Sequence, residues 1–330
     1  MEEIFATTTY GIGSYGAYIF ERNNLPVQSV LIITPFWYGI GGGETFAHDL
    51  CKSLQKKYTV DVATIPYTET WEGMDYVDGF KLMLRLLKNT IPAIWNNRYK
   101  KIYCLGLIAS FVGFLLFWKR KYAVMLCLYD YNRWSPLSIM LNSFKKVFVE
   151  AGDPGVKEMI TMGVHKNKLV KFEEWIDQSK FYPIIRYNRK LQVLFVGRPI
   201  RIKGRHIIEE CEREMKGLVD FIYVENVPYE ELPIYYQNAD ICVVPSLYAE
   251  GSDRVVAEAA SCGCVVIASN KGALEDMVMP FGYVIEPTAR NFKDMILYIQ
   301  RNPKRLEKIR QKTIEYAKAH FSEKNAEVFY

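Results

Sequence analysis

The sequence predicts an α/β protein built from two Rossmann-like domains that face each other across a cleft. Short apolar runs typical of buried strands alternate with helix-like segments along most of the chain. This alternation breaks once, in residues 173–190, where charges cluster around a proline without a sustained period. A chain of 330 residues also exceeds what one hydrophobic core usually organises, so two domains are expected.

The first series of strands and helices opens at residues 30–34, and Gly41, Gly42 and Gly43 then lead into a helix that we expect to end near Lys57. Its further strands are expected at residues 59–65, 101–105, 122–128, 147–149 and 169–170. Strands and helices that alternate at this spacing form a parallel sheet with helices on both faces.

The second series starts directly after the break, with an apolar strand that ends in Gly197. Its strands are expected at residues 191–197, 219–224, 240–244, 264–268 and 283–285, and an amphipathic helix rich in lysine and arginine at 303–320. The predicted domains are residues 1–180 and 181–305. Residues 306–330 form a terminal helix, whose return to the first domain is left open.

Composition narrows the classes of function. Apolar residues make up 50% of the chain and charged residues 24%, as in ordinary soluble proteins. The net charge of +5 is spread along the sequence, without the basic stripe of a nucleic-acid binder. A net positive charge of this size is consistent with binding of an anionic small ligand, and equally with a weak attraction to acidic lipids. The seven cysteines lack metal-ligand spacing and are expected to be reduced, as in a cytoplasmic protein.

One segment resembles a membrane span and another a dinucleotide-binding motif, but we expect neither function. Residues 102–118 form an apolar run near the lower length limit of a membrane span, but Gly106 divides it into a strand and a helix. A buried β–α–β element is therefore favoured over a span. Residues 11–16 fit the dinucleotide pattern GxGxxG, yet a weak strand precedes them and no acidic residue follows about 20 positions later. The acidic start of the chain does not resemble a signal peptide.

Two carboxylates eight positions apart are the main candidates for chemistry. Glu250 follows the strand at 240–244, and Glu258 lies in a predicted helix, where Gly251 and Glu258 would project from nearly one face. Ligands of doubly wound sheets bind beyond the carboxyl ends of the strands, and a helix amino terminus there attracts phosphate. Carboxylates bind sugar hydroxyls and the amino terminus of a helix binds phosphate, so the two together are suited to a sugar nucleotide. The alternative is that both are solvated surface residues.

Two cations follow the first strand of the second domain. Arg198 comes directly after Gly197, and Lys203 follows five residues later with Gly204, at the start of a helix. Paired cations at the end of a strand can neutralise a diphosphate leaving group. If this pair is considered alone, the alternative is that both cations are solvated loop residues without a role in binding.

These motifs together resemble glycosyltransferase family 4, the "glycosyl transferases group 1" type of retaining enzyme with the two-Rossmann GT-B fold. The resemblance rests on Gly-Gly-x-Glu after the first strand, Gly-Arg then Lys-Gly after the linker, and Glu-x7-Glu before a helix. It runs from about residue 30 to the end of the chain. Residues 152–183, 227–246 and 320–322 resemble further stretches of the family in the same order.

The resemblance implies roles at the matching positions. Glu258 would bind the donor ribose, Glu250 would lie near the donor sugar, and Arg198 with Lys203 would hold the diphosphate. Residues 1–180 would bind the acceptor and residues 181–305 the donor. The expected donor-binding residues are Gly42, Gly43, Gly197, Gly251, Ser252 and Glu258, and the expected catalytic residues are Glu250, Arg198, Lys203 and Asp130. The family needs no divalent metal, and the sequence has no Asp-x-Asp motif and no His/Cys cluster.

The chain departs from the family pattern at several positions. Many members carry a histidine after the fourth strand, where this chain has Asp130; the carboxylate either replaces it on the acceptor side or caps the next helix. The phenylalanine-glycine that commonly follows the first glutamate is Ser252-Asp253 here. Asp253 places a negative charge near the proposed phosphate site unless Arg254 pairs with it.

We therefore expect a cytoplasmic retaining glycosyltransferase that moves a hexose-type sugar from a nucleoside-diphosphate sugar to a hydroxyl of a glycan, lipid or small molecule, without other cofactors. One alternative is a sugar-nucleotide epimerase on the same scaffold. Another is a non-catalytic subunit that binds carbohydrate or nucleotide. Trp71, Tyr76 and Trp134 either contact a sugar or a membrane, or pack inside the protein. The sugar, base, acceptor and oligomeric state are not predicted.

Overall fold

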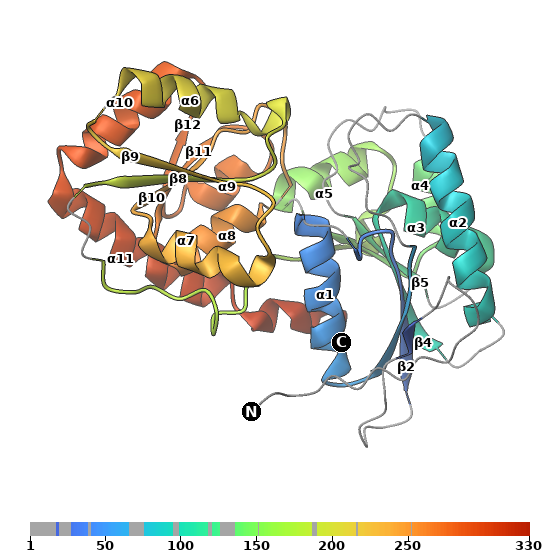
Figure 1. Ribbon diagram of the computed structural model, residues 1–330. Coiled ribbons are helices and arrows are strands. Elements are labelled where there is room, and N and C mark those ends of the chain that lie inside the picture. Colours follow the sequence, from blue (N-terminus) through green and yellow to red (C-terminus); the bar gives the residue numbers. More distant parts are fainter. Residues whose placement is uncertain are drawn as a thin grey trace.

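The computed structural model has two α/β domains side by side (Figure 1). It describes residues 18–19, 28–38, 41–65, 76–94, 99–117, 121–125, 136–150, 152–186, 190–215, 217–251 and 253–330. The predictions at residues 11–16, Trp71, Asp130, Trp134 and Ser252, and the side chain of Tyr76, lie outside the described part of the chain.

The first domain is built on a sheet whose described strands follow the order β1-β3-β2-β4-β5-β6-β7. The strands are β1 (Tyr18–Ile19), β2 (Ser29–Ile33), β3 (Thr59–Ala63), β4 (Tyr99–Leu105), β5 (Lys121–Met125), β6 (Lys146–Val149) and β7 (Leu169–Lys171). All neighbours pair in parallel except β1, which runs antiparallel to β3. In register, Leu31 of β2 lies between Asp61 and Ile102.

Helices cover both faces of this sheet. One face carries α2 (Tyr76–Ile94), α3 (Gly106–Leu116), α4 (Leu137–Asn142) and α5 (Gly152–Thr161), and the short η1 (Lys166–Lys168) precedes β7. The other face carries α1 (Gly42–Gln55) and the last turns of the chain. Consecutive β2 residues alternate between the two cores: Leu31 and Ile33 join the first, and Val30 and Ile32 the second. A strand buried on both faces must be apolar throughout, which explains the continuous apolar run.

The second domain has a parallel sheet in the order β12-β11-β10-β8-β9. The strands are β8 (Gln192–Val196), β9 (Asp220–Val224), β10 (Ile241–Val244), β11 (Val265–Ser269) and β12 (Tyr283–Ile285). The helices are η2 (Arg201–Lys203), α6 (Arg205–Glu214), η3 (Tyr229–Glu231), α7 (Leu232–Asn238), α8 (Arg254–Ser261), α9 (Leu274–Val278), α10 (Ala289–Gln300) and α11 (Pro303–His320). Two apolar clusters, one on each face, form its core.

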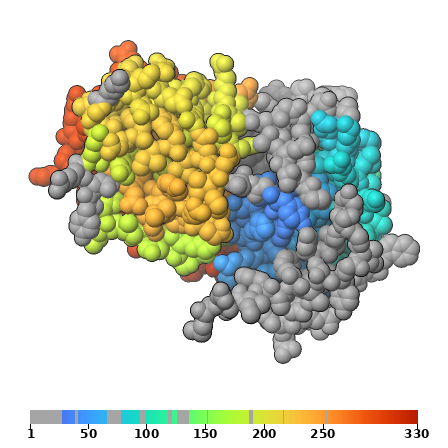
Figure 2. All heavy atoms as spheres, viewed as in Figure 1, coloured from blue at the N-terminus to red at the C-terminus, as the bar shows by residue number. Residues whose placement is uncertain are grey.

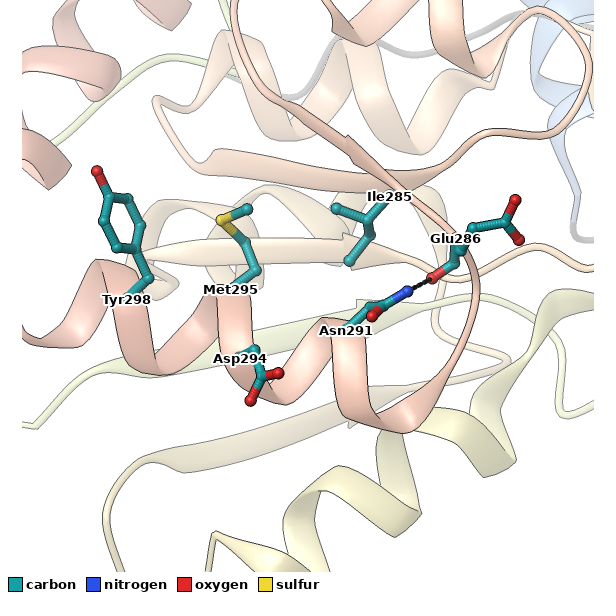
Figure 3. A pocket seen from close by; sticks show the side chains of 6 residues that line it. All are labelled: Ile285, Glu286, Asn291, Asp294, Met295 and Tyr298. Carbon is teal, nitrogen blue, oxygen red and sulfur yellow. Dashed lines mark hydrogen bonds between the residues drawn. The ribbon is translucent and has the colours of Figure 1, made fainter.

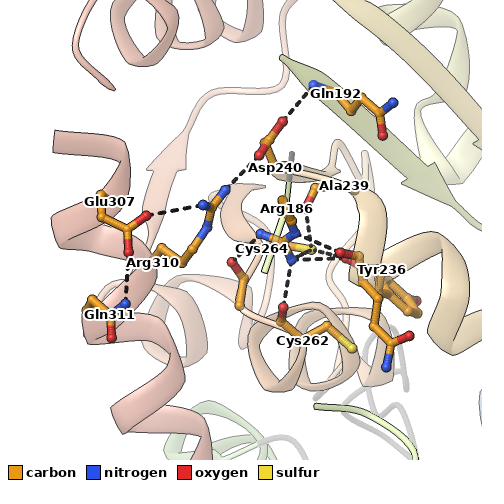
Figure 4. A network of polar contacts seen from close by, with 12 residues as sticks. Arg186, Gln192, Tyr236, Ala239, Asp240, Cys262, Cys264, Glu307, Arg310 and Gln311 are labelled. Carbon is orange, nitrogen blue, oxygen red and sulfur yellow. Dashed lines mark hydrogen bonds and ion pairs between the residues drawn. The ribbon is translucent and has the colours of Figure 1, made fainter. Parts of the chain in front are cut away.

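Arg186 attaches the linker to the second domain (Figure 4). Its guanidinium donates hydrogen bonds to the carbonyl oxygens of Tyr236 and Gln237 in α7 and of Cys262 and Gly263 after α8. Carbonyls at the carboxyl ends of helices lack partners within the helix and carry partial negative charge. One cation therefore satisfies the ends of two helices and holds the chain where it enters β8.

The end of the chain returns to the first domain. Helix α11 packs against α8 in the second domain, and η4 (Glu323–Phe329) then contacts α1 in the first. Phe329 is buried among Phe46, Phe148 and Trp175, and its carbonyl oxygen accepts a hydrogen bond from the Tyr103 hydroxyl. The first domain's core therefore includes side chains from both ends of the sequence.

The predicted fold class and the predicted strands are confirmed. Each expected strand occurs within a few residues of its predicted bounds. The apolar run at residues 102–118 contains the end of β4 and all of α3, and β5 follows it. Among the described residues, none of the helices has both the length and the apolar character that crossing a membrane requires.

We expect Phe329→Ala to lower the free energy of unfolding by about 3 to 5 kcal/mol, because it leaves a cavity among packed aromatic rings. The neighbouring Val328 is 39% exposed, so Val328→Ala serves as a matched control with an expected effect within about 0.5 kcal/mol. Urea unfolding followed by tryptophan fluorescence measures both. Equal, small effects would show that the return segment does not complete the first domain's core.

Candidate active site

The strand order of each sheet creates one position where consecutive connections leave in opposite directions. In the second domain this switch point lies between β8 and β10, and in the first between β2 and β4. Ligands of open α/β sheets bind beyond the carboxyl ends of the strands at such points. Arg198 and Lys203 follow β8, and Glu250 follows β10. The cations and the first carboxylate therefore flank the second domain's switch point, as their sequence positions predicted.

Glu250 is held at this point by its backbone. It forms an isolated parallel bridge with Gly272, and its carbonyl oxygen accepts a hydrogen bond from Ala273 N at 2.9 Å. Gly272 has φ of +66°, and a β-carbon there would collide with the Glu250 backbone. Glycine is required at 272 for both reasons, since a side chain would push Glu250 away.

Lys203 reaches Glu250 because its turn packs tightly beneath the strand β10. Gly204, at φ +72°, lets the turn approach Pro245 so closely that a β-carbon would collide with the Pro245 carbonyl. Lys203 Nζ lies 2.7 Å from Glu250 Oε1 and 3.5 Å from Asp253 Oδ2. The Ser246 hydroxyl donates to the same Glu250 oxygen at 2.8 Å.

Arg198 is half-buried on the same side of the sheet, directly after Gly197, which has φ of +154°. Within the described ranges its side chain forms no ion pair. The structure thus places both predicted cations after β8 but shows only Lys203 engaged with a carboxylate.

The amino end of α8 differs from the prediction in two ways. The helix begins at Arg254, so Gly251 lies in the preceding bend and not on a common helical face with Glu258. Asp253 is the N-cap, with its Oδ1 accepting from Val255 N at 3.0 Å. A side-chain carboxylate therefore already occupies the position at which a phosphate was expected. Asp253 pairs with Lys203, not with Arg254, because capping turns its carboxylate toward the β8 turn.

Glu258 is buried, with an exposed fraction of 3%, in the wall of α8. The Tyr236 hydroxyl donates to its Oε2 at 2.8 Å, and Arg254 Nε lies 3.7 Å from its Oε1. Burial raises the pKa of Glu258 to about 7, against the lowering effect of Arg254 and Tyr236. The pKa of this carboxyl therefore lies close to neutral pH.

Arg254 connects α8 to the first domain. Its guanidinium contacts Asp49 of α1 at 2.6 Å, Glu174 at 2.9 Å and the Tyr229 hydroxyl at 3.1 Å. Only 5% of Arg254 is exposed. Sequence analysis missed this role, although a charged residue at the start of a helix rich in valine and alanine was a signal that it has buried partners.

Three carboxylates, those of Asp49, Glu174 and Glu258, lie within 4 Å of the single Arg254 guanidinium. Burial raises the pKa of Glu174 and of Asp49 above their usual range, while Arg254 acts in the opposite direction. Glu150 also lowers the pKa of Glu174, against the effect of burial. Arg254 is the cation that Asp49, Glu174 and Glu258 share at the domain boundary.

The glycines at the start of α1 lie opposite α8. A β-carbon at Gly42 would lie 3.8 Å from Arg254 Cδ, and one at Gly43 would lie 3.3 Å from the Phe36 ring. The ring of Phe36 also fills the space beside Gly106, where a β-carbon would come within 2.9 Å of it. Gly43 and Gly106 thus accommodate Phe36 at the first domain's switch point. Gly42 has room for a β-carbon, so the protein's own atoms do not explain its lack of a side chain.

One hollow of the second domain lies away from the switch point. It measures about 430 Å³ and opens at the outer edge of the sheet, between the end of β12 and α10 (Figure 3). Its lining residues are Ile285, Glu286, Asn291, Asp294, Met295 and Tyr298. β12 is the edge strand of the sheet, and β11 and β10 separate it from the switch point.

In the described part of the chain, no group of His, Cys, Asp and Glu side chains is arranged to hold a metal ion.

We expect Arg254→Met to destabilise the protein by about 3 to 5 kcal/mol near neutral pH, because it leaves buried carboxylates without a cation. The loss should shrink as the pH falls, since these carboxyls then take up protons. Arg290→Met is a matched control: that arginine is 87% exposed, and its helical pair with Asp294 should contribute no more than about 0.5 kcal/mol. Urea unfolding of both variants tests this, and similar losses in the two would contradict it.

The pKa of Glu258 predicts a pH dependence of stability. Its folded value of about 7 lies above the ordinary 4.5, so folding takes up a proton between these limits and Glu258 lowers stability as the pH rises through them. Relative to Glu258→Gln, the wild-type protein should lose about 3 kcal/mol of unfolding free energy across this range. Chemical denaturation at about pH 5 and pH 8 measures the difference. A gap between the two proteins that stays constant with pH would refute the raised pKa.

Comparison with known proteins was made on sequence and on fold. Residues 179–320 match the family described as glycosyl transferases group 1. No curated protein sequence matches the chain.

Solved structures with the same fold include sucrose-phosphate synthase from Thermosynechococcus elongatus, with a TM-score of 0.74, 19% identity, and coverage of 92% of this chain and 97% of that one. The catalytic domain of starch synthase IV from Arabidopsis thaliana, bound to ADP and acarbose, has a TM-score of 0.67 at 14% identity and covers 92% and 98%. HepE from Anabaena, in complex with UDP-glucose, has a TM-score of 0.64 at 13% identity and covers 92% and 99%.

The family match lies on the half of the chain that carries Lys203, Glu250 and Glu258, and the fold matches extend over both domains. The resemblance to glycosyl transferases group 1 is confirmed for residues 179–320, whereas family 4 stays a prediction. Residues 179–320 therefore match the glycosyl transferases group 1 family, and the two domains together have the GT-B fold.

Proposed function

We propose that this protein is a retaining glycosyltransferase that moves a hexose-type sugar from a nucleoside-diphosphate sugar to an acceptor hydroxyl. The observation that carries the proposal is the Lys203–Glu250 pair, 2.7 Å apart at the second domain's switch point. The glycine-led end of α1 lies on the other side of the domain boundary, against Arg254. A cation for phosphate and a carboxylate for sugar hydroxyls are thus adjacent where α/β sheets bind ligands.

Lys203 and Arg198 are assigned to the diphosphate. Because Asp253 occupies the amino end of α8, backbone N–H groups there are less available, and side-chain cations must supply most of the neutralisation. Charge grows on the phosphate oxygen as the bond to the sugar breaks. Two carboxylates already orient Lys203, and the diphosphate would compete with them for its ammonium group.

Glu250 and Glu258 are assigned to the two polyol parts of the donor. Glu250, anchored by Gly272, is placed to accept hydrogen bonds from hydroxyls of the sugar ring. Glu258, oriented by Tyr236, is placed to accept from the ribose. In the reaction, the acceptor oxygen bonds to the anomeric carbon on the face from which the phosphate oxygen departs. Net retention follows, and the acceptor's proton leaves on the departing phosphate.

The donor class is supported by neighbours of the same fold. The Arabidopsis structure holds ADP, and the Anabaena structure holds UDP-glucose. We propose that no divalent metal takes part, with the acceptor hydroxyl supplied by a glycan, lipid or small molecule and Asp130 on the acceptor side. The described cysteines are buried and unpaired, which supports a reducing, cytoplasmic location.

A non-catalytic nucleotide-binding role is the second candidate. It is favoured by the burial of Glu258 beneath Arg254 and by the Asp253 cap, both of which limit access to the donor groups. A binding subunit would bind a nucleotide without releasing sugar. An epimerase would instead release an altered sugar from the donor without needing any acceptor.

We expect the purified protein to release or transfer sugar from one member of a panel of UDP, ADP and GDP sugars. Lys203→Ala should lower turnover by about 30- to 1000-fold, a loss of about 2 to 4 kcal/mol in transition-state stabilisation, with a smaller change in donor affinity. Arg201→Ala is the matched control, because Arg201 is an exposed cation in the same turn.

Turnover is measured by the nucleoside diphosphate released, and chromatography identifies the sugar. Unchanged turnover in Lys203→Ala would reject its role. Nucleotide binding without any sugar release across the panel would favour the non-catalytic subunit.

A further inference from the structure

We propose that the outer surface of α2 and α3 docks onto an anionic membrane. This surface, here called the outer apolar face, is made of large apolar side chains that are 37% to 57% exposed. They are Phe80, Leu84 and Ile91 of α2 and Phe111, Phe114 and Leu115 of α3. The two helices pack against each other, and α2 lies at the edge of the molecule farthest from the second domain (Figures 1 and 2). The proposal concerns a surface remote from the candidate active site.

Helix α2 has two apolar sides, and only one of them faces the sheet. Leu82 and Leu86 are buried in the core. At about 100° per residue, Phe80, Leu84 and Ile91 fall within about 40° of one another on a different side. A surface helix needs only one apolar stripe to pack on its own domain, so the second stripe is unexplained by the fold.

A basic stripe runs beside the apolar one. Lys81, Arg85 and Lys88 are exposed and repeat at intervals of three and four residues, which places them on one side of α2. Lys81 pairs with Asp78 at 3.2 Å, the acidic residue in the first turn. Arg85 and Lys88 form no ion pair with other described residues. The helix thus presents exposed apolar groups next to exposed cations.

Helix α3 extends the apolar surface without adding charge. Its sequence from Gly106 to Leu116 contains no charged residue. Ala109 and Val112 are buried against the sheet, whereas Phe111, Phe114 and Leu115 point outward. Large contiguous apolar surfaces on a folded protein mark sites of contact with a protein or a membrane.

Charge favours a membrane over a second copy of the chain. A two-fold dimer formed through this surface would bring the Arg85 and Lys88 of one copy close to those of the other. An anionic bilayer instead offers phosphate groups to the cations and acyl chains to the phenylalanine and leucine side chains. The surplus of positive charge on the whole protein, +5, acts in the same direction.

Sedimentation with lipid vesicles tests the proposal on the full chain. We expect binding to vesicles of phosphatidylcholine with phosphatidylglycerol, weaker binding at high salt, and little binding to phosphatidylcholine alone. Arg85→Gln/Lys88→Gln and Leu84→Ser/Phe114→Ser should each reduce the partition coefficient by about tenfold or more. All four side chains are exposed at least in part, so the variants should keep the wild-type circular dichroism spectrum.

The matched control is Lys304→Gln/Lys308→Gln, which removes the same charge from the exposed side of α11. It should bind vesicles like the wild-type protein. Equal losses in both charge variants would show attraction by net charge alone and overturn the proposal, as would absence of binding to anionic vesicles at low salt. A dimer in analytical ultracentrifugation that Leu84→Ser/Phe114→Ser converts to a monomer would assign the surface to a second copy instead. None of these measurements depends on sugar transfer.

Discussion

The arrangement of the two domains depends on the buried guanidinium of Arg254. It belongs to the second domain, yet its partners Asp49 and Glu174 lie 205 and 80 residues away in the sequence. Buried charges lose their hydration, and only well-placed partners compensate for this loss. Because Arg254 belongs to the second domain and both of these partners to the first, we infer that the network specifies one relative position of the domains more than it adds stability.

The same network governs the acidic character of the candidate site. Glu258 shares Arg254 with the first domain, whereas Glu250 and Asp253 share Lys203 within the second. The two cations therefore divide the carboxylates into one group at the domain boundary and a second group at the switch point. A diphosphate that approached Lys203 would compete with carboxylates for it. The opposing charges keep the lysine oriented before a ligand arrives.

The fold was largely predictable because burial on both faces makes strands uniformly apolar, as in β2 and β10. Lys203 and Glu250 were predictable as neighbours because the carboxyl ends of parallel strands share one edge of a sheet. The partners of Arg254 were not, since a sequence pattern shows that a charge needs a counterion without showing which distant one it finds. The start of α8 was also misplaced, because the capping side chain of Asp253 determines it, not the apolar period.

The return of η4 to the first domain constrains the order in which the protein acquires its structure on the ribosome. The strands of the second domain, from β8 to β12, are contiguous in the sequence and can assemble once they have emerged. The first domain emerges earlier, but the aromatic centre around Phe46 lacks Phe329 until synthesis has passed that residue. The half of the molecule that is translated first therefore completes its native packing only after the end of the chain has been made.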